Sequence, residues 1–170
     1  MMEHFKKSMP IDYEKSENGL IVVKATSEVL DHHGDIVKAD GYDIDHLMKS
    51  KKKANLEHMK HIEVGEIISA ELIKGDTPYV TNTIKLHENK KGEAVREMLE
   101  DGTIGSVSIE FKAYEKDMIS AGKRRIINKS YPTGIAFCQK PANPQALVMQ
   151  KAEPIDVIKT LEYYQKSMNA

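Results

Sequence analysis

Cysteine is almost absent from this chain, because Cys138 is the only one among 170 residues. A single cysteine excludes an internal disulfide, so a reducing, cytosol-like compartment fits better than a secreted scaffold held by disulfides. Long hydrophobic runs are absent too. No segment approaches the roughly 20 apolar residues that cross a bilayer, and residues 1–16 lack the apolar centre of a secretory signal. We therefore expect a soluble protein with no membrane partner.

An excess of charge of one sign is also missing. The chain has 25 basic and 26 acidic residues, for a net charge of −1. No overall field favours nucleic acid, so no nucleic-acid partner is expected. The lysine-rich residues 49–53 are interpreted as a solvated helix end. A chain of this length fits one ordinary domain, and it contains no repeat and no low-complexity tract.

What the sequence does contain is a majority of strand patterns with a few helical ones. Runs of β-branched residues separated by turn residues predict strands within 19–30, 64–86 and 104–139. Apolar residues at helical spacing predict helices within 44–53, 91–102 and 154–168. The fold class is therefore α+β and mostly β: an antiparallel barrel or strongly curled sheet with about three helices.

The same patterns predict how the chain is divided. Residues 1–18 are expected to be a mobile N-terminal segment, and residues 19–150 the folded domain. Residues 151–170 are expected to form an amphipathic helix that packs either on the core or on a partner, for example in a homodimer.

The stretch "SVSIEF" (106–111) raises the question of chemistry. Strand alternation sends Ser106, Ser108 and Glu110 to one face, and apolar residues to the other. This pattern alone describes any amphipathic strand, since a serine hydroxyl is a weak nucleophile until a neighbouring base takes its proton. A base must therefore be found elsewhere in the chain.

Histidines supply the candidate bases. His58 and His61 precede a predicted strand, and His32 and His33 lie in a predicted turn. These four could form a metal-binding module, but extended structure turns positions three apart toward opposite faces. We therefore expect no metal and no cofactor. Cys138 lies in an apolar run and is expected to pack in the core.

Several motifs taken together resemble a known family. They are "SEVLDHHGDIV" (27–37), "LEHMKHIEVGEI" (56–67), "DGTIGSVSIEF" (101–111) and "KPANPQA" (140–146). In this order they are similar to motifs of the tailed-phage prohead proteases, the capsid-maturation serine proteases related in fold to herpesvirus assemblin. The resemblance covers about residues 20–150. It implies a herpesvirus-protease-like fold.

The resemblance also implies catalytic residues. The family's histidine falls on His58, with Gly65 seven residues later, and its nucleophile falls on Ser108. The family's third residue, a glutamate shortly before Pro-Ala-Asn-Pro, is replaced here by Gly134. Conversely, the family's glycine two residues after the nucleophile is Glu110. We therefore expect Glu110 to supply the carboxylate that orients the histidine.

The implied function is a serine endopeptidase of phage head maturation. It would cleave scaffold and capsid-protein segments inside the immature head, in the host cytoplasm, and process its own termini. The alternative is a noncatalytic head-assembly or scaffold-associated domain with a degraded triad.

Ser106 is the competing nucleophile and His61 the competing base. Arg124 and Arg125 carry charge in the following segment, where a surface role is expected rather than contact with an oxyanion.

Overall fold

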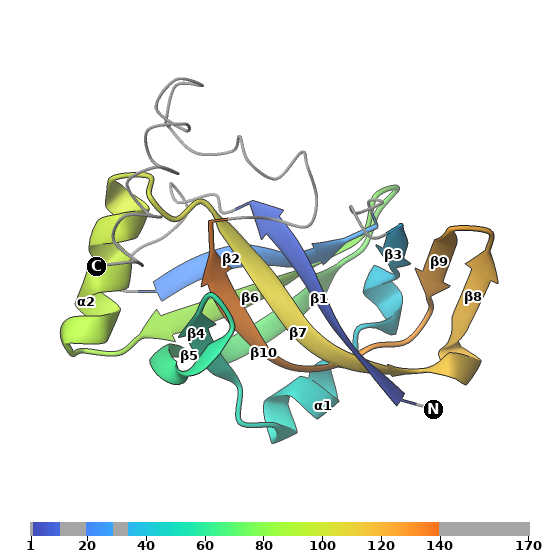
Figure 1. Cartoon of the computed structure of the whole chain (residues 1–170), viewed down its shortest axis with the longest axis horizontal. Helices are drawn as coiled ribbons and strands as arrows, with labels where there is room; N and C mark the ends of the chain where they lie inside the picture. Colours follow the sequence, from blue (N-terminus) through green and yellow to red (C-terminus); the bar gives the residue numbers. More distant parts are fainter. Residues whose placement is uncertain (1, 11–19, 29–33, 140–170) are drawn as a thin grey trace.

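The computed structural model describes residues 2–10, 20–28 and 34–139, and these residues form two sheets and two α-helices (Figure 1). The larger sheet has the strand order β1-β7-β10-β4-β5-β6-β2, and the smaller one the order β3-β9-β8. The strands are β1 (Met2–Pro10), β2 (Leu20–Ser27), β3 (Asp35–Val37), β4 (Lys53–Leu56), β5 (Met59–Ile73), β6 (Tyr79–Leu86), β7 (Ser106–Tyr114), β8 (Met118–Ala121), β9 (Arg124–Ile127) and β10 (Tyr131–Cys138). The helices are α1 (Ile44–Lys49) and α2 (Lys90–Glu100), with short 3-10 turns at Ala39–Gly41 and Glu115–Asp117.

The larger sheet is curled but not closed. Its pairings are antiparallel except for β10 with β4, which is parallel. Figure 1 shows β1 and β7 lying across β2 and β6, and β2 contacts β7 although the two strands are not paired. Among the described strands, β1 and β2 remain the two edges, so of the two expected forms, a barrel or a curled sheet, the barrel is not formed. The mostly-β prediction holds.

Helix α2 ends where its sequence predicts, whereas α1 ends at Lys49, before the expected residue 53. The side chain of Asn89 accepts a hydrogen bond from the backbone N–H of Gly92 at 3.0 Å and so caps α2. Gly102, just past the end of α2, has φ 82°, the left-handed conformation expected there. The third expected helix lies in residues 154–168, outside the described residues.

The start of the chain contains a strand that the sequence pattern did not indicate. Within the segment 1–18, which we expected to be mobile, residues 2–10 form β1 and pair along β7 from Met2 opposite Tyr114 to Pro10 opposite Ser106. This pairing satisfies the outer edge of β7, which would otherwise expose unpaired backbone groups.

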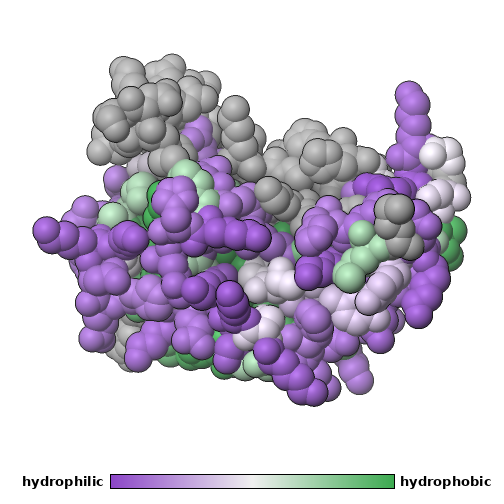
Figure 2. All heavy atoms as spheres, turned by 60° about the horizontal axis from the view of Figure 1, so that its bottom comes forward, coloured by the Kyte–Doolittle hydropathy of each residue, from purple (hydrophilic) through white to green (hydrophobic). Residues whose placement is uncertain are grey.

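The core lies on the apolar face of β7 and between the sheet and both helices. Val107, Ile109 and Phe111 are buried there, as the alternation predicts. Leu47 of α1 and Val95 of α2 are buried against the same core. The face of β7 that carries the serines is not exposed to solvent there, however, since Ser106 and Ser108 are each only 2% exposed. The outer surface seen in Figure 2 is mostly hydrophilic, with apolar side chains in small separate areas.

A buried tyrosine, Tyr42, makes the stability of this fold depend on pH. Burial raises the pKa of Tyr42 above its ordinary value, and the hydrogen bond with Asn82 lowers it by less. Above about pH 10 the unfolded chain loses this proton while the folded chain keeps it, so stability falls as pH rises.

We expect the Tyr42→Phe variant to lack this alkaline loss, which amounts to up to about 1.4 kcal/mol per pH unit for one proton. Urea unfolding from pH 8 to 11 measures it. The variant should be less stable at pH 8, because Asn82 loses its partner, but its stability should fall less steeply with pH. Parallel curves for the two proteins would contradict the prediction.

Candidate active site

His58 lies in a two-residue turn between β4 and β5. Leu56 pairs with Met59, so Glu57 and His58 alone form the turn, with φ values of 52° and 61°. Tight hairpins prefer this left-handed conformation at both positions, but usually with Asn-Gly, since a side chain there costs roughly 1–2 kcal/mol. Backbone strain of this kind is concentrated at functional sites.

The turn is held against the end of β10. The backbone N–H of Glu57 donates to the carbonyl of Phe137 at 3.0 Å. The backbone N–H of Gln139 donates to Glu57 Oε1 at 2.7 Å. These two bonds fix the position of the neighbouring His58 relative to the sheet.

His58 and Glu110 form a pair although 52 residues separate them. Nδ1 of His58 lies 2.8 Å from Glu110 Oε2, and the two side chains are 15% and 18% exposed. A carboxylate only accepts, so Nδ1 carries the proton and Nε2 is left with a free lone pair. In chemical terms, the arrangement is a histidine base oriented by a carboxylate.

Asn55 is a second hydrogen-bond partner of this carboxylate. Its Nδ2 donates to Glu110 Oε1 at 3.2 Å, so each carboxylate oxygen receives a bond from a different side chain. Sequence reasoning missed Asn55. A polar residue in the otherwise apolar end of strand β4 is a signal, but its neighbour on β7 depends on the pairing of β4 with β10.

Ser108 lies on the same sheet face as this pair. It is opposite Ala136 on β10, which is opposite Asn55 on β4, and it precedes Glu110 by two residues, about 7 Å of strand. Among the described residues, the Ser108 hydroxyl has no hydrogen-bond partner, and none joins it to His58 Nε2. The structure therefore places the predicted nucleophile, base and acid on one face, but only the base and the acid are in contact.

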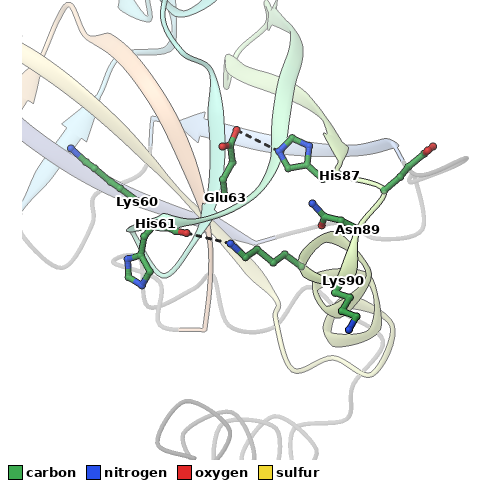
Figure 3. Close-up of a pocket in the computed structure, with 8 residues that line it drawn as sticks. Lys60, His61, Glu63, His87, Asn89 and Lys90 are labelled. Carbon is green, nitrogen blue, oxygen red and sulfur yellow. Dashed lines mark hydrogen bonds and ion pairs between the residues drawn. The ribbon is translucent and has the colours of Figure 1, made fainter.

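The competing residues have other environments. The hydroxyl of Ser106 donates to the carbonyl of Cys138 at 2.8 Å in a buried position, where it supports the pairing of β7 with β10. His61 is exposed and lines a hollow of about 810 Å³ beside the start of α2 (Figure 3). Neither residue contacts Glu110 within the part of the chain that the structure describes.

The exchanged residues Glu110 and Gly134 are direct neighbours across β7 and β10. A Cβ atom at position 134 would lie 2.9 Å from the carbonyl oxygen of Lys53 and 3.1 Å from Glu110 Oε1. The carboxylate therefore occupies the space above the glycine. A glutamate at position 110 on β7 or at position 134 on β10 can thus place its carboxylate in the same region of the sheet face.

We expect Gly134→Ala to lower the free energy of unfolding by about 1–3 kcal/mol, because the backbone oxygen of Lys53 must move away from the new methyl group. Urea denaturation measures this loss. Ser120→Ala, an exposed change on β8, should stay within about 0.5 kcal/mol. Equal stability of the two variants would show that the strands adapt without cost.

A hollow of about 470 Å³ opens beside Glu110. Glu63, on its wall, pairs with Lys53 at 3.3 Å. Glu63 also pairs with His87 at 3.4 Å, on the side of the hollow of about 810 Å³ (Figure 3). Desolvation raises the pKa of Glu63, but the bonds and charges of Lys53 and His87 outweigh it, so this pKa lies below its ordinary value. The hollow is lined by Ser50, Lys51, Lys53, Asn55, Lys60, Glu63, Glu110 and Thr133.

The remaining candidates fall outside this site. Arg125 forms a two-pronged ion pair with Asp35, at 2.8 and 3.0 Å, in the smaller sheet, and a further pair with Glu3. Cys138 is buried in the core, as expected. His32, His33 and the Pro-Ala-Asn-Pro stretch lie outside the described residues.

No group of three or more histidine, cysteine, aspartate or glutamate side chains within 2–10, 20–28 and 34–139 is arranged to hold a metal ion. Over the same ranges, no helix has the length and apolar character needed to span a membrane.

Comparison with known proteins finds a likeness in structure but not in sequence. No family model and no curated protein matches the sequence. The structure is similar to that of the bacteriophage T4 capsid assembly protease, gp21, with a TM-score of 0.58 and 11% sequence identity. The match covers 81% of this chain and 98% of the phage protein. At this identity the likeness establishes a shared fold, that of a phage capsid assembly protease.

Proposed function

We propose that this protein is a serine endopeptidase that cleaves scaffold and capsid-protein segments during phage head maturation. The observation that carries the proposal is the contact of 2.8 Å between His58 Nδ1 and Glu110 Oε2 on the sheet face that bears Ser108. The fold shared with a capsid assembly protease supports the substrate class. The motifs that resemble the prohead proteases point the same way.

In the proposed reaction, Ser108 Oγ attacks the scissile carbonyl carbon while His58 Nε2 takes the hydroxyl proton. The tetrahedral intermediate collapses, the C–N bond breaks, and His58 returns the proton to the leaving amine. Water then attacks the resulting ester on Ser108 by the same proton route, which releases the acid and restores the hydroxyl. Glu110 stabilises the imidazolium formed in each half of the reaction.

The proposal requires His58 Nε2 and Ser108 Oγ to come within hydrogen-bond distance, which is not the case in the described structure. Catalytic hydrogen bonds are often long before substrate binds and shorten in the complex. The movement that the proposal requires is one of the side chains of His58 and Ser108, because the backbone of the turn is held to Phe137 and Gln139. The hollow beside Glu110 gives a substrate chain room to approach.

A noncatalytic head-assembly domain is the second candidate. The observations that favour it are the missing bond between His58 and Ser108 and the deep burial of Ser108, which is 2% exposed. The two functions are distinguished by incubating the protein with its cognate capsid and scaffold proteins, alongside the Ser108→Ala variant. Cleavage that requires Ser108 supports the peptidase, and intact substrates with both proteins support the assembly domain.

A further inference from the structure

Asn55 has a feature that its fold role does not explain. The side chain is buried, with the residue 3% exposed, and its Oδ1 has no hydrogen-bond partner among the described residues. An unpaired buried acceptor costs about 1–3 kcal/mol. An apolar side chain at this position would avoid that cost, so packing alone does not favour asparagine.

The other end of the same amide has a definite partner. Nδ2 donates to Glu110 Oε1 at 3.2 Å, and a carboxylate accepts only from a donor, so the amide is held with its nitrogen toward Glu110 and its oxygen without a partner. Between the two residues lies only β10 with Gly134 and Ala136, whose small size leaves the line between Asn55 and Glu110 open.

The bond from Asn55 holds Oε1 of the carboxylate, whereas His58 holds Oε2. With Oε2 at His58 Nδ1 and Oε1 at Asn55 Nδ2, the carboxylate cannot rotate about its terminal bond without breaking these hydrogen bonds. A donor on the carboxylate also favours its ionised form. Both effects keep the proton on Nδ1 and the lone pair on Nε2.

We infer that Asn55 is a positioning residue that holds Glu110 in the orientation and charge state needed to orient His58. The inference rests on the proposed peptidase function and adds a fourth side chain to its site. Asn55 acts through Glu110 and not on the substrate. Removing its amide should therefore slow the chemical step and leave substrate binding almost unchanged.

The first test compares Asn55→Ala in two backgrounds. In the wild-type background we expect kcat to fall about tenfold with KM within twofold. In the Glu110→Gln background the same change should have less than a twofold effect, because its route to His58 is already removed. Equal losses in both backgrounds would overturn the inference.

The second test uses the pH profile of Asn55→Ala, which removes the donor to Glu110 Oε1. A carboxylate that is no longer held against His58 stabilises the imidazolium less, so the acidic limb of kcat/KM should move toward lower pH. A limb that stays in place would contradict the inference. The other charged residues around the pair are Lys6, which is opposite Glu110 on β1, Glu57, which precedes His58, Lys112 on β7, and the residues Lys51, Lys53, Lys60 and Glu63 that line the hollow.

A third measurement does not depend on cleavage. The His58 imidazole can be titrated by NMR in the Ser108→Ala protein, with and without Asn55→Ala, after thermal unfolding has shown that both are folded. A lower His58 pKa with alanine at position 55 supports the inference even if the wild-type protein cleaves nothing. An unchanged pKa rejects it even if the protein is a peptidase.

Discussion

Replacing Ser108 by alanine is expected to abolish cleavage of the cognate capsid and scaffold proteins. Removal of the nucleophile from a serine protease lowers kcat by a factor on the order of 10⁶. The hydroxyl has no hydrogen-bond partner among the described residues, so the change should cost little stability. Gel electrophoresis of capsid and scaffold proteins, over a time course with purified enzyme, measures the rate.

Ser106→Ala is the matched control for this experiment. It removes the same hydroxyl two residues earlier on the same strand face, where the group donates to the carbonyl of Cys138. We expect it to lower stability by about 1 kcal/mol and to change the cleavage rate by less than tenfold. If Ser106→Ala stops cleavage and Ser108→Ala does not, the nucleophile has been assigned to the wrong serine.

Glu110→Gln should produce the second largest loss, about 10⁴-fold in kcat, with KM nearly unchanged. The amide of glutamine can donate to His58 Nδ1, which favours the tautomer whose Nε2 carries the proton and cannot act as a base. Steady-state kinetics on a peptide that spans a cleavage site separates kcat from KM. Unchanged turnover would mean that Glu110 is not part of the catalytic group.

Two further variants make this test specific. Glu63→Gln removes a carboxylate from the wall of the same hollow and should change kcat by less than about threefold, since Glu63 does not contact His58.

In a Glu110→Gly protein, adding Gly134→Glu should restore at least about tenfold activity, because position 134 lies opposite position 110. Recovery will be partial, since the new side chain crowds the Lys53 carbonyl.

The sequence predicted the local elements better than their arrangement. The hairpin of β5 and β6, the end of α2 at Gly102 and the apolar face of β7 follow from spacing and turn residues that lie close together in the chain. The strand β1 was not predicted, because its alternation is interrupted by "KK" and its stability comes from pairing with β7, about 100 residues away.

The residues of the site also differ in whether the sequence could place them. Ser108 and Glu110 could be placed on one face from strand alternation, and His58 from the family resemblance, before any distance was known. Asn55 could not be placed beside Glu110, since their proximity depends on the parallel pairing of β4 with β10. The burial of Ser108 was also missed, because alternation gives the direction of a side chain but not what covers it.

The anchoring of the His58 turn to Phe137 and Gln139 has a consequence for the timing of folding. These partners are about 80 residues further along the chain, so the geometry around His58 depends on late, non-local contacts. During synthesis the β4–β5 hairpin emerges long before β10 exists. The base and its carboxylate therefore cannot assemble until nearly all of the described chain has left the ribosome, which delays any hydrolytic activity until the domain is complete.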